Sequence, residues 1–231
     1  MNEVSEPKRK NRGRFVTLTV AITGGALVAA LLSFNQAAKG YEYYLVGNLI
    51  ALFFIPMLAI MLLLGEEPAD FGFRLGESRR VRWITAIMFA GLLGLFFVYA
   101  KRPEFQQYYP IFKGYQFVPF RGDNIFLETD PASLIYAWVS YGLYMFCWEF
   151  FFRGYLLFGL ARTINWAAVI VQALAFMLLH WGKPMPEFIA SLPAGIILGM
   201  LALKAKSFVP CFALHWSAAV AFDIIVLLFR P

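Results

Sequence analysis

Seven runs of predominantly apolar residues recur along the chain, and short stretches that hold most of the charged residues separate them. Most runs approach the roughly 20 residues that an α-helix needs to cross a lipid bilayer. The runs cover residues 15–34, 44–64, 83–99, 134–160, 166–180, 188–203 and 208–229. This pattern predicts an all-α, polytopic transmembrane helix bundle with about seven or eight spans, of which the fifth and sixth are short.

The composition agrees with this prediction. The chain has 231 residues, 61% of them hydrophobic, and a mean hydropathy of +0.66, which is far more apolar than a soluble domain. A net charge of +6 would suit a nucleic-acid partner, but the positive residues cluster beside the apolar runs, where they indicate topology. We therefore expect the lipid bilayer as a partner and no nucleic acid.

The distribution of Lys and Arg predicts the orientation. Residues 1–14 hold five of them without an apolar run, which predicts a disordered basic tail. A signal peptide has a similar outline, but the following apolar run is too long for one. The tail and the loops expected on its side hold twelve positive residues, against seven on the other side. The positive-inside rule then places the N-terminus in the cytoplasm, and we expect a multi-pass protein of a bacterial cytoplasmic membrane.

The chain divides by chemistry near residue 130. Residues 1–14 form the basic cytoplasmic tail, and residues 15–129 form N-terminal transmembrane helices and a long non-cytoplasmic loop. That loop, from 100 to 133, contains helix-stopping prolines and could cover a site. Residues 130–231 form the expected catalytic helix bundle, since the intramembrane acids and histidines all lie there. Small residues at Gly91, Gly94, Gly195 and Gly199 predict close helix packing.

One acid and one base interrupt the fourth apolar run. Glu149 and Arg153 are four residues apart, so they share one face of a helix and can neutralise each other. An isolated ion at membrane depth costs several kcal/mol, so such residues are rare and often functional. A purely structural ion pair that fixes helix packing is the alternative interpretation.

Both histidines of the protein also lie in apolar runs. His180 ends the fifth run and His215 lies in the seventh. Two imidazoles and a carboxylate can activate a water molecule as general bases or hold a divalent metal. Asp223 is the second intramembrane acid, and it lies roughly 80° around the helix from His215. The same residues could relay protons in a transporter.

These residues resemble the motifs of the CPBP family of intramembrane proteases, also called the CAAX protease and bacteriocin-processing or Abi family. That family has Glu-Glu-x-x-x-Arg, then Phe-x-x-x-His, then His-x-x-x-Asn/Asp, each on its own span. Here the second motif is complete from Phe176 to His180. The first has Trp148 in place of its first glutamate, and the third has Ala219 in place of the amide or carboxylate.

The resemblance implies hydrolysis of a peptide bond in a membrane-associated substrate. Glu149 and His180 would polarise the water, although neighbouring helical residues point about 100° apart, so Glu149 can replace the residue at 148 only on a rotated or distorted helix. His215, with Asp223, would stabilise the oxyanion, and Arg153 would hold Glu149. No cofactor is implied; zinc held by Glu149, His180 and His215 is the alternative.

The expected substrate is a membrane-anchored peptide or protein. A prenylated C-terminus, a C-terminal sorting signal and a leader peptide all fit the resemblance. Two other functions stay open, namely a catalytically inactive CPBP-like membrane scaffold and a proton-coupled transporter.

Overall fold

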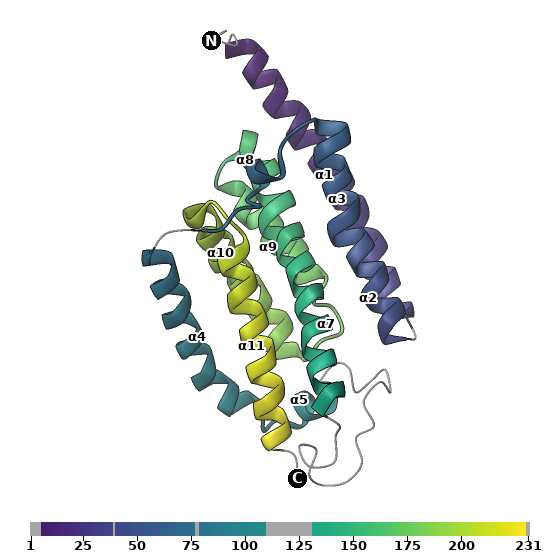
Figure 1. The fold of residues 1–231 in the computed structure, drawn as a ribbon, viewed down its shortest axis with the longest axis vertical. Helices are drawn as coiled ribbons and strands as arrows, with labels where there is room; N and C mark the ends of the chain where they lie inside the picture. Colours follow the sequence, from purple (N-terminus) through teal and green to yellow (C-terminus); the bar gives the residue numbers. More distant parts are fainter. Residues whose placement is uncertain (1–5, 39, 77–78, 110–130, 230–231) are drawn as a thin grey trace.

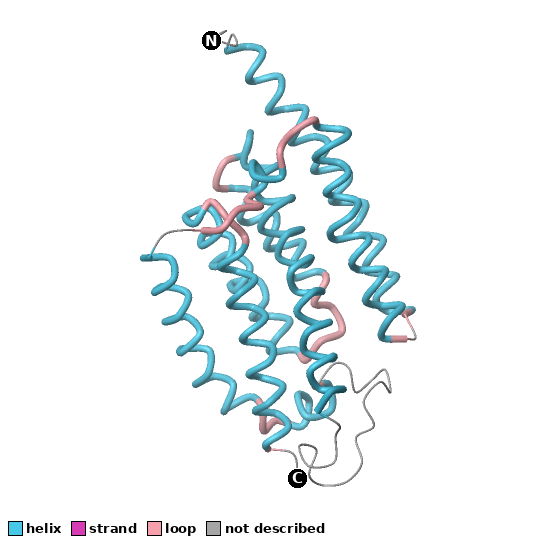
Figure 2. Tube along the Cα trace, viewed as in Figure 1, coloured by secondary structure: helices cyan, strands magenta, loops and turns pink. Residues whose placement is uncertain are grey.

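The computed structural model describes residues 6–38, 40–76, 79–109 and 131–229. Within these residues the secondary structure is helical, with turns and loops between the helices and no strand (Figure 2). Helical segments cover all seven predicted apolar runs except for one or two residues at the ends of the fifth and seventh, which confirms the predicted fold class.

The helices are longer than the apolar runs at most ends. The second and fourth runs are continuous helical segments that change between α and π geometry. The segments are α1 Glu6–Ala37; α2 Tyr41–Leu49, α3 Ile55–Leu58 and the π-helical turns Ile50–Phe54 and Ala59–Leu64; a 3₁₀ turn Pro68–Phe71; α4 Arg79–Tyr99; α5 Pro103–Tyr108; α7 Pro131–Glu149, the π-helical Phe150–Leu156 and α8 Leu157–Ile164; α9 Ala167–Leu178; α10 Met185–Ala205; and α11 Val209–Leu228.

Five of the described helices are long and apolar enough to cross a membrane. They are α1, the α2–α3 segment, α4, α10 and α11, while α9 is a shorter apolar helix. The segment from α7 to α8 is long, but it contains several Tyr and Trp residues and the Glu149/Arg153 pair, which lower its hydropathy. The protein is therefore a multi-pass membrane protein.

The helices pack around α7 and the π-helical turn that follows it (Figure 1). Helix α2 packs on α7, α1 packs on α8, and α9 packs on α10. Helix α11 packs on α7 and also on α4, which lies at the edge of the bundle. Three consecutive buried aromatic residues, Phe150–Phe152, lie in the centre of the core.

The loops that the sequence placed on the side of the N-terminus meet at one end of the bundle. Arg12 and Arg162 each contact Glu66 at 3.1 Å, and the Phe208 backbone N–H donates to the Gly72 carbonyl at 3.4 Å. Helix α1 already begins at Glu6, so the basic stretch is helical from there, where disorder was predicted. The part of the long loop at 110–130 lies outside the described residues.

The glycine predictions divide into two outcomes. A Cβ at Gly195 or Gly199 would lie within 3.1 Å of side chains of α9, so these glycines permit close packing, as predicted. A Cβ at Gly91 or Gly94 would meet nothing within 4 Å. The prediction of close packing is wrong for these two, because both glycines lie at exposed positions of α4 and no neighbouring helix covers them.

Candidate active site

Glu149 and Arg153 form a fully buried ion pair at the junction between α7 and the π-helical turn. Arg153 Nη1 donates to Glu149 Oε1 at 3.0 Å, which confirms that the two side chains share one helix face. The π-helical turn distorts the helix locally, and Glu149 could take the place of the residue at 148 only on a distorted or rotated helix. Such turns are frequent at functional sites. This π-helical turn begins at Phe150, however, so Glu149 itself keeps its α-helical position.

His215 on α11 is the second partner of Glu149. Its Nδ1 donates to the same Oε1 atom at 2.6 Å, and its side chain is 22% exposed. A carboxylate that accepts from Nδ1–H fixes the imidazole tautomer in which Nε2 keeps its lone pair. Glu149 therefore orients His215, and the free Nε2 of His215 can accept a proton.

His180 lies in the turn after α9 and makes a different set of contacts. Its Nδ1 donates to the Phe176 carbonyl at 2.8 Å, which leaves its Nε2 as an acceptor in the neutral ring. The centre of its ring lies 4.3 Å from the centre of the Phe176 ring and 5.7 Å from the centre of the Trp148 ring. The resemblance implied that Glu149 and His180 polarise the water together, whereas the structure pairs Glu149 with His215 and places Trp148 beside His180.

Aromatic rings close the buried side of the site. The Arg153 guanidinium lies 4.0 Å from the centre of the Phe176 ring. Among the described residues, Glu149 Oε2 and Arg153 Nε and Nη2 have no hydrogen-bond partner. The two buried charges are therefore compensated mainly by each other and by His215. Removing one member of this cluster would leave an uncompensated buried charge and destabilise the protein.

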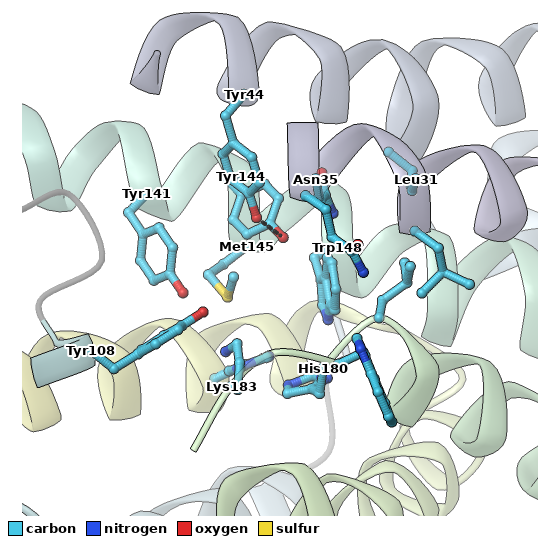
Figure 3. Close-up of a pocket in the computed structure, with 15 residues that line it drawn as sticks. Leu31, Asn35, Tyr44, Tyr108, Tyr141, Tyr144, Met145, Trp148, His180 and Lys183 are labelled. Atoms are coloured by element: carbon cyan, nitrogen blue, oxygen red, sulfur yellow. Dashed lines mark hydrogen bonds between the residues drawn. The ribbon is translucent and has the colours of Figure 1, made fainter. Parts of the chain in front are cut away.

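Two cavities open on the histidines. The smaller has a volume of about 110 Å³ and is bordered by polar residues of α1, α2 and α7 together with Trp148 (Figure 3). The larger has a volume of about 690 Å³ and is bordered mainly by apolar residues of α4, α10 and α11. Four residues border both: Tyr141, His180, Lys183 and His215. A polar and an apolar compartment thus meet at the two imidazoles.

Lys183 belongs to a polar cluster at the end of the bundle away from the N-terminus. Its Nζ donates to Glu187 Oε1 at 2.7 Å, and the Tyr109 hydroxyl donates to Glu187 Oε2 at 2.6 Å. Burial lowers the pKa of Lys183, but the charge and hydrogen bond of Glu187, together with Tyr108 and Asp223, raise it by more, so that the pKa lies above its ordinary value. Lys183 therefore stays protonated beside the histidines.

Asp223 does not join the histidines. It is buried on α11, eight residues beyond His215, and borders neither of the two cavities. Ala219, at the position of the family's amide or carboxylate, borders the larger cavity and supplies no polar atom. The role of Asp223 beside His215 therefore stays a prediction.

The zinc alternative requires Glu149, His180 and His215 to share one metal. Glu149 Oε1 already accepts from Arg153 and from Nδ1 of His215, and Glu149 borders neither cavity. Across the described parts of the chain, no group of three or more His, Cys, Asp or Glu residues is placed to hold a metal ion.

Two site residues were not identified from the sequence. Tyr141 precedes Trp148 by seven residues, so two turns of α7 place both on one helix face. Lys183 follows His180 by three residues in the same turn. These spacings can be read from the sequence. That Tyr141 and Lys183 border both cavities, however, can be seen only in the structure.

A bundle of membrane-spanning helices with a buried carboxylate–imidazole pair defines a polytopic membrane protein whose polar centre is suited to hydrolysis. Residues 130–221 match the family model of type II CAAX prenyl endopeptidase Rce1-like proteins. This match confirms the resemblance to the CPBP family and indicates a membrane endopeptidase at the level of the family. No curated protein matches the chain. No solved structure matches it either.

Proposed function

We propose that this protein hydrolyses a peptide bond of a membrane-anchored peptide or protein, with His215 as general base and Glu149 as the residue that orients it. The observation that carries the proposal is the 2.6 Å hydrogen bond between Glu149 Oε1 and His215 Nδ1. A carboxylate in this position stabilises the imidazolium that forms when Nε2 takes a proton. Glu149 thus acts through His215.

The two imidazoles can hold the reacting water together. With both Nδ1 atoms donating elsewhere, each neutral ring offers Nε2 as an acceptor, so one water can donate to His180 and to His215. His215 then takes one proton while the water oxygen bonds to the substrate carbonyl carbon. The C–N bond breaks in the second step, and the leaving amine receives the proton that His215 holds.

The carbonyl oxygen becomes negative when the water adds and requires a hydrogen-bond donor, which the side chain of Ala219 cannot supply. Tyr141 and Lys183 are the hydroxyl and ammonium groups that border both cavities with the histidines. They are the candidate donors to the oxyanion, and a preorganised donor is a large source of rate enhancement. The proposed reaction uses no cofactor.

The larger cavity favours a substrate with an apolar anchor. It lies between α4 and α10, and its border is largely aliphatic and aromatic. A prenylated or sorting-signal C-terminus, or the apolar part of a leader peptide, meets this requirement. With the N-terminus in the cytoplasm, the Lys183 end of the site faces the opposite side of the membrane.

Cleavage assays in lipid test the proposal. The purified protein is incubated with prenylated, sorting-signal and leader peptides, with and without a metal chelator, alongside Glu149→Gln and His180→Ala. We expect wild-type cleavage that survives the chelator and falls by about 10²–10⁴-fold in both variants, the range for loss of acid–base catalysis. Chelator-sensitive cleavage would support a metal mechanism instead.

Trp148 supports a second candidate function, a catalytically inactive CPBP-like scaffold. Its ring lies 5.7 Å from His180, where the family has the glutamate that works with this histidine. Trp148→Glu introduces that carboxylate. If the scaffold interpretation holds, wild type cleaves nothing and Trp148→Glu gains cleavage of the same peptides. If wild type cleaves, the scaffold interpretation fails.

A further inference from the structure

The smaller cavity receives part of its wall from helices outside the segment that matches the family. Asn35 and Gln36 at the end of α1 and Tyr44 on α2 border it, together with residues of α7 and of the 179–184 turn. Figure 3 shows Asn35, Tyr44 and Tyr144 on one side of this cavity and His180 and Lys183 on the other. The N-terminal helices therefore reach the histidines.

The cavity leads from the bundle end to the buried site. Gln36 and Trp181 are exposed at the end of the bundle away from the N-terminus, whereas Trp148 and His180 are buried. All four border the same cavity. The cavity thus extends from the exposed Gln36 and Trp181 to the buried imidazole ring of His180.

The chemistry of the border favours water as the occupant. A volume of about 110 Å³ has room for about three or four waters at roughly 30 Å³ each. The hydroxyl groups of Tyr44 and Tyr144 lie 2.9 Å apart at its wall. The buried Nε1 of Trp148 has no hydrogen-bond partner among the described residues. Polar groups at membrane depth are tolerated where they border a water-filled space.

We propose that α1, α2 and α7 form a hydrated vestibule, the cavity defined above, that delivers the hydrolytic water to His180 and His215. The apolar anchor of the substrate occupies the larger cavity, so water and substrate reach the imidazoles from different compartments. The hydration of the vestibule is independent of the proposed function, whereas its role as a water supply rests on that function.

Radiolytic hydroxyl-radical footprinting of the wild-type protein in lipid nanodiscs tests the hydration. Radicals form from water in place, and methionine is readily oxidised. Met145 borders the vestibule although it is only 3% exposed, whereas Met61 is 54% exposed on the outer face of the bundle. We expect Met145 to oxidise at least about threefold faster than Met61, since bilayer hydrocarbon excludes water. Equal or slower oxidation of Met145 would overturn the proposal.

A pair of variants on α1 tests the delivery of water. Leu32 borders the vestibule, and Leu18 lies exposed on the outer face of the same helix. Leu32→Phe fills the vestibule and is expected to slow both Met145 oxidation and peptide cleavage by about tenfold, while Leu18→Phe changes neither. Thermal unfolding of both variants monitors folding, and the wild-type footprint does not depend on it.

The outcomes separate the vestibule from the proposed function. Fast oxidation of Met145 without cleavage of any peptide supports the vestibule and counts against the protease. Slow oxidation of Met145 with normal cleavage removes the vestibule and leaves the protease intact. Normal cleavage by Leu32→Phe, with Met145 oxidation reduced, would overturn the role in water delivery.

Discussion

Individual residues explain both the strength and the limit of the sequence prediction. The spacing of Glu149 and Arg153 predicted their ion pair, because helix geometry fixes neighbours four residues apart. The partner of Glu149 on α11 could not be predicted, because it depends on the axial offset between two helices. Hydropathy leaves that offset uncertain by several residues. The histidine that contacts Glu149 in the structure is therefore His215 and not His180.

Replacing Arg153 tests how the buried cluster stabilises the bundle. Arg153→Met leaves the Glu149 carboxylate buried with only His215, and loss of one partner of a buried pair costs about 3–5 kcal/mol. We expect a lower temperature of thermal unfolding in detergent. The double variant Glu149→Gln with Arg153→Met carries no unpaired charge.

That double variant provides the control for the ion-pair interpretation. It should be more stable than Arg153→Met alone, because replacing both partners of a buried pair is often nearly neutral. If the double variant lost as much stability as Glu149→Gln and Arg153→Met lose together, the two charges would not interact. That result would contradict the interpretation.

At the scale of elements, the seven helical segments were predictable and their internal geometry was not. Apolar length alone locates a span, which is why the positions of α4, α10 and α11 agree with the sequence. The π-helical turn Phe150–Leu156 has no signature in the hydropathy pattern. It coincides with tight packing, since the backbone carbonyl of Phe71 approaches Gly154.

A matched pair of glycine variants tests that packing. A Cβ at Gly154 would lie 2.9 Å from the Phe71 carbonyl oxygen, and this backbone atom cannot move easily. Gly154→Ala is expected to destabilise the protein by about 1–3 kcal/mol through overpacking. Gly91→Ala should be close to neutral, because its Cβ would meet nothing within 4 Å. Thermal unfolding of both in detergent is the measurement, and equal losses would contradict the packing.

At the scale of the whole molecule, the bundle brings together residues from three distant parts of the chain. The sequence predicted that the last four runs carry the chemistry, and the site residues Glu149, His180 and His215 lie there. It did not predict that α4 borders an apolar cavity or that α1 and α2 border a polar one. Cavities arise from the spaces between helices, which periodicity along one helix does not describe.

The most direct measurement of the central claim is mass spectrometry of a membrane-anchored peptide after incubation with the protein in ¹⁸O-labelled water. Hydrolysis assisted by His215 predicts one ¹⁸O atom in the new carboxyl group with wild type. It also predicts a loss of rate of about 10²–10⁴-fold in His215→Ala, the range for a general base. Labelled product formed at an undiminished rate by correctly folded His215→Ala would contradict the assignment of His215 as the base.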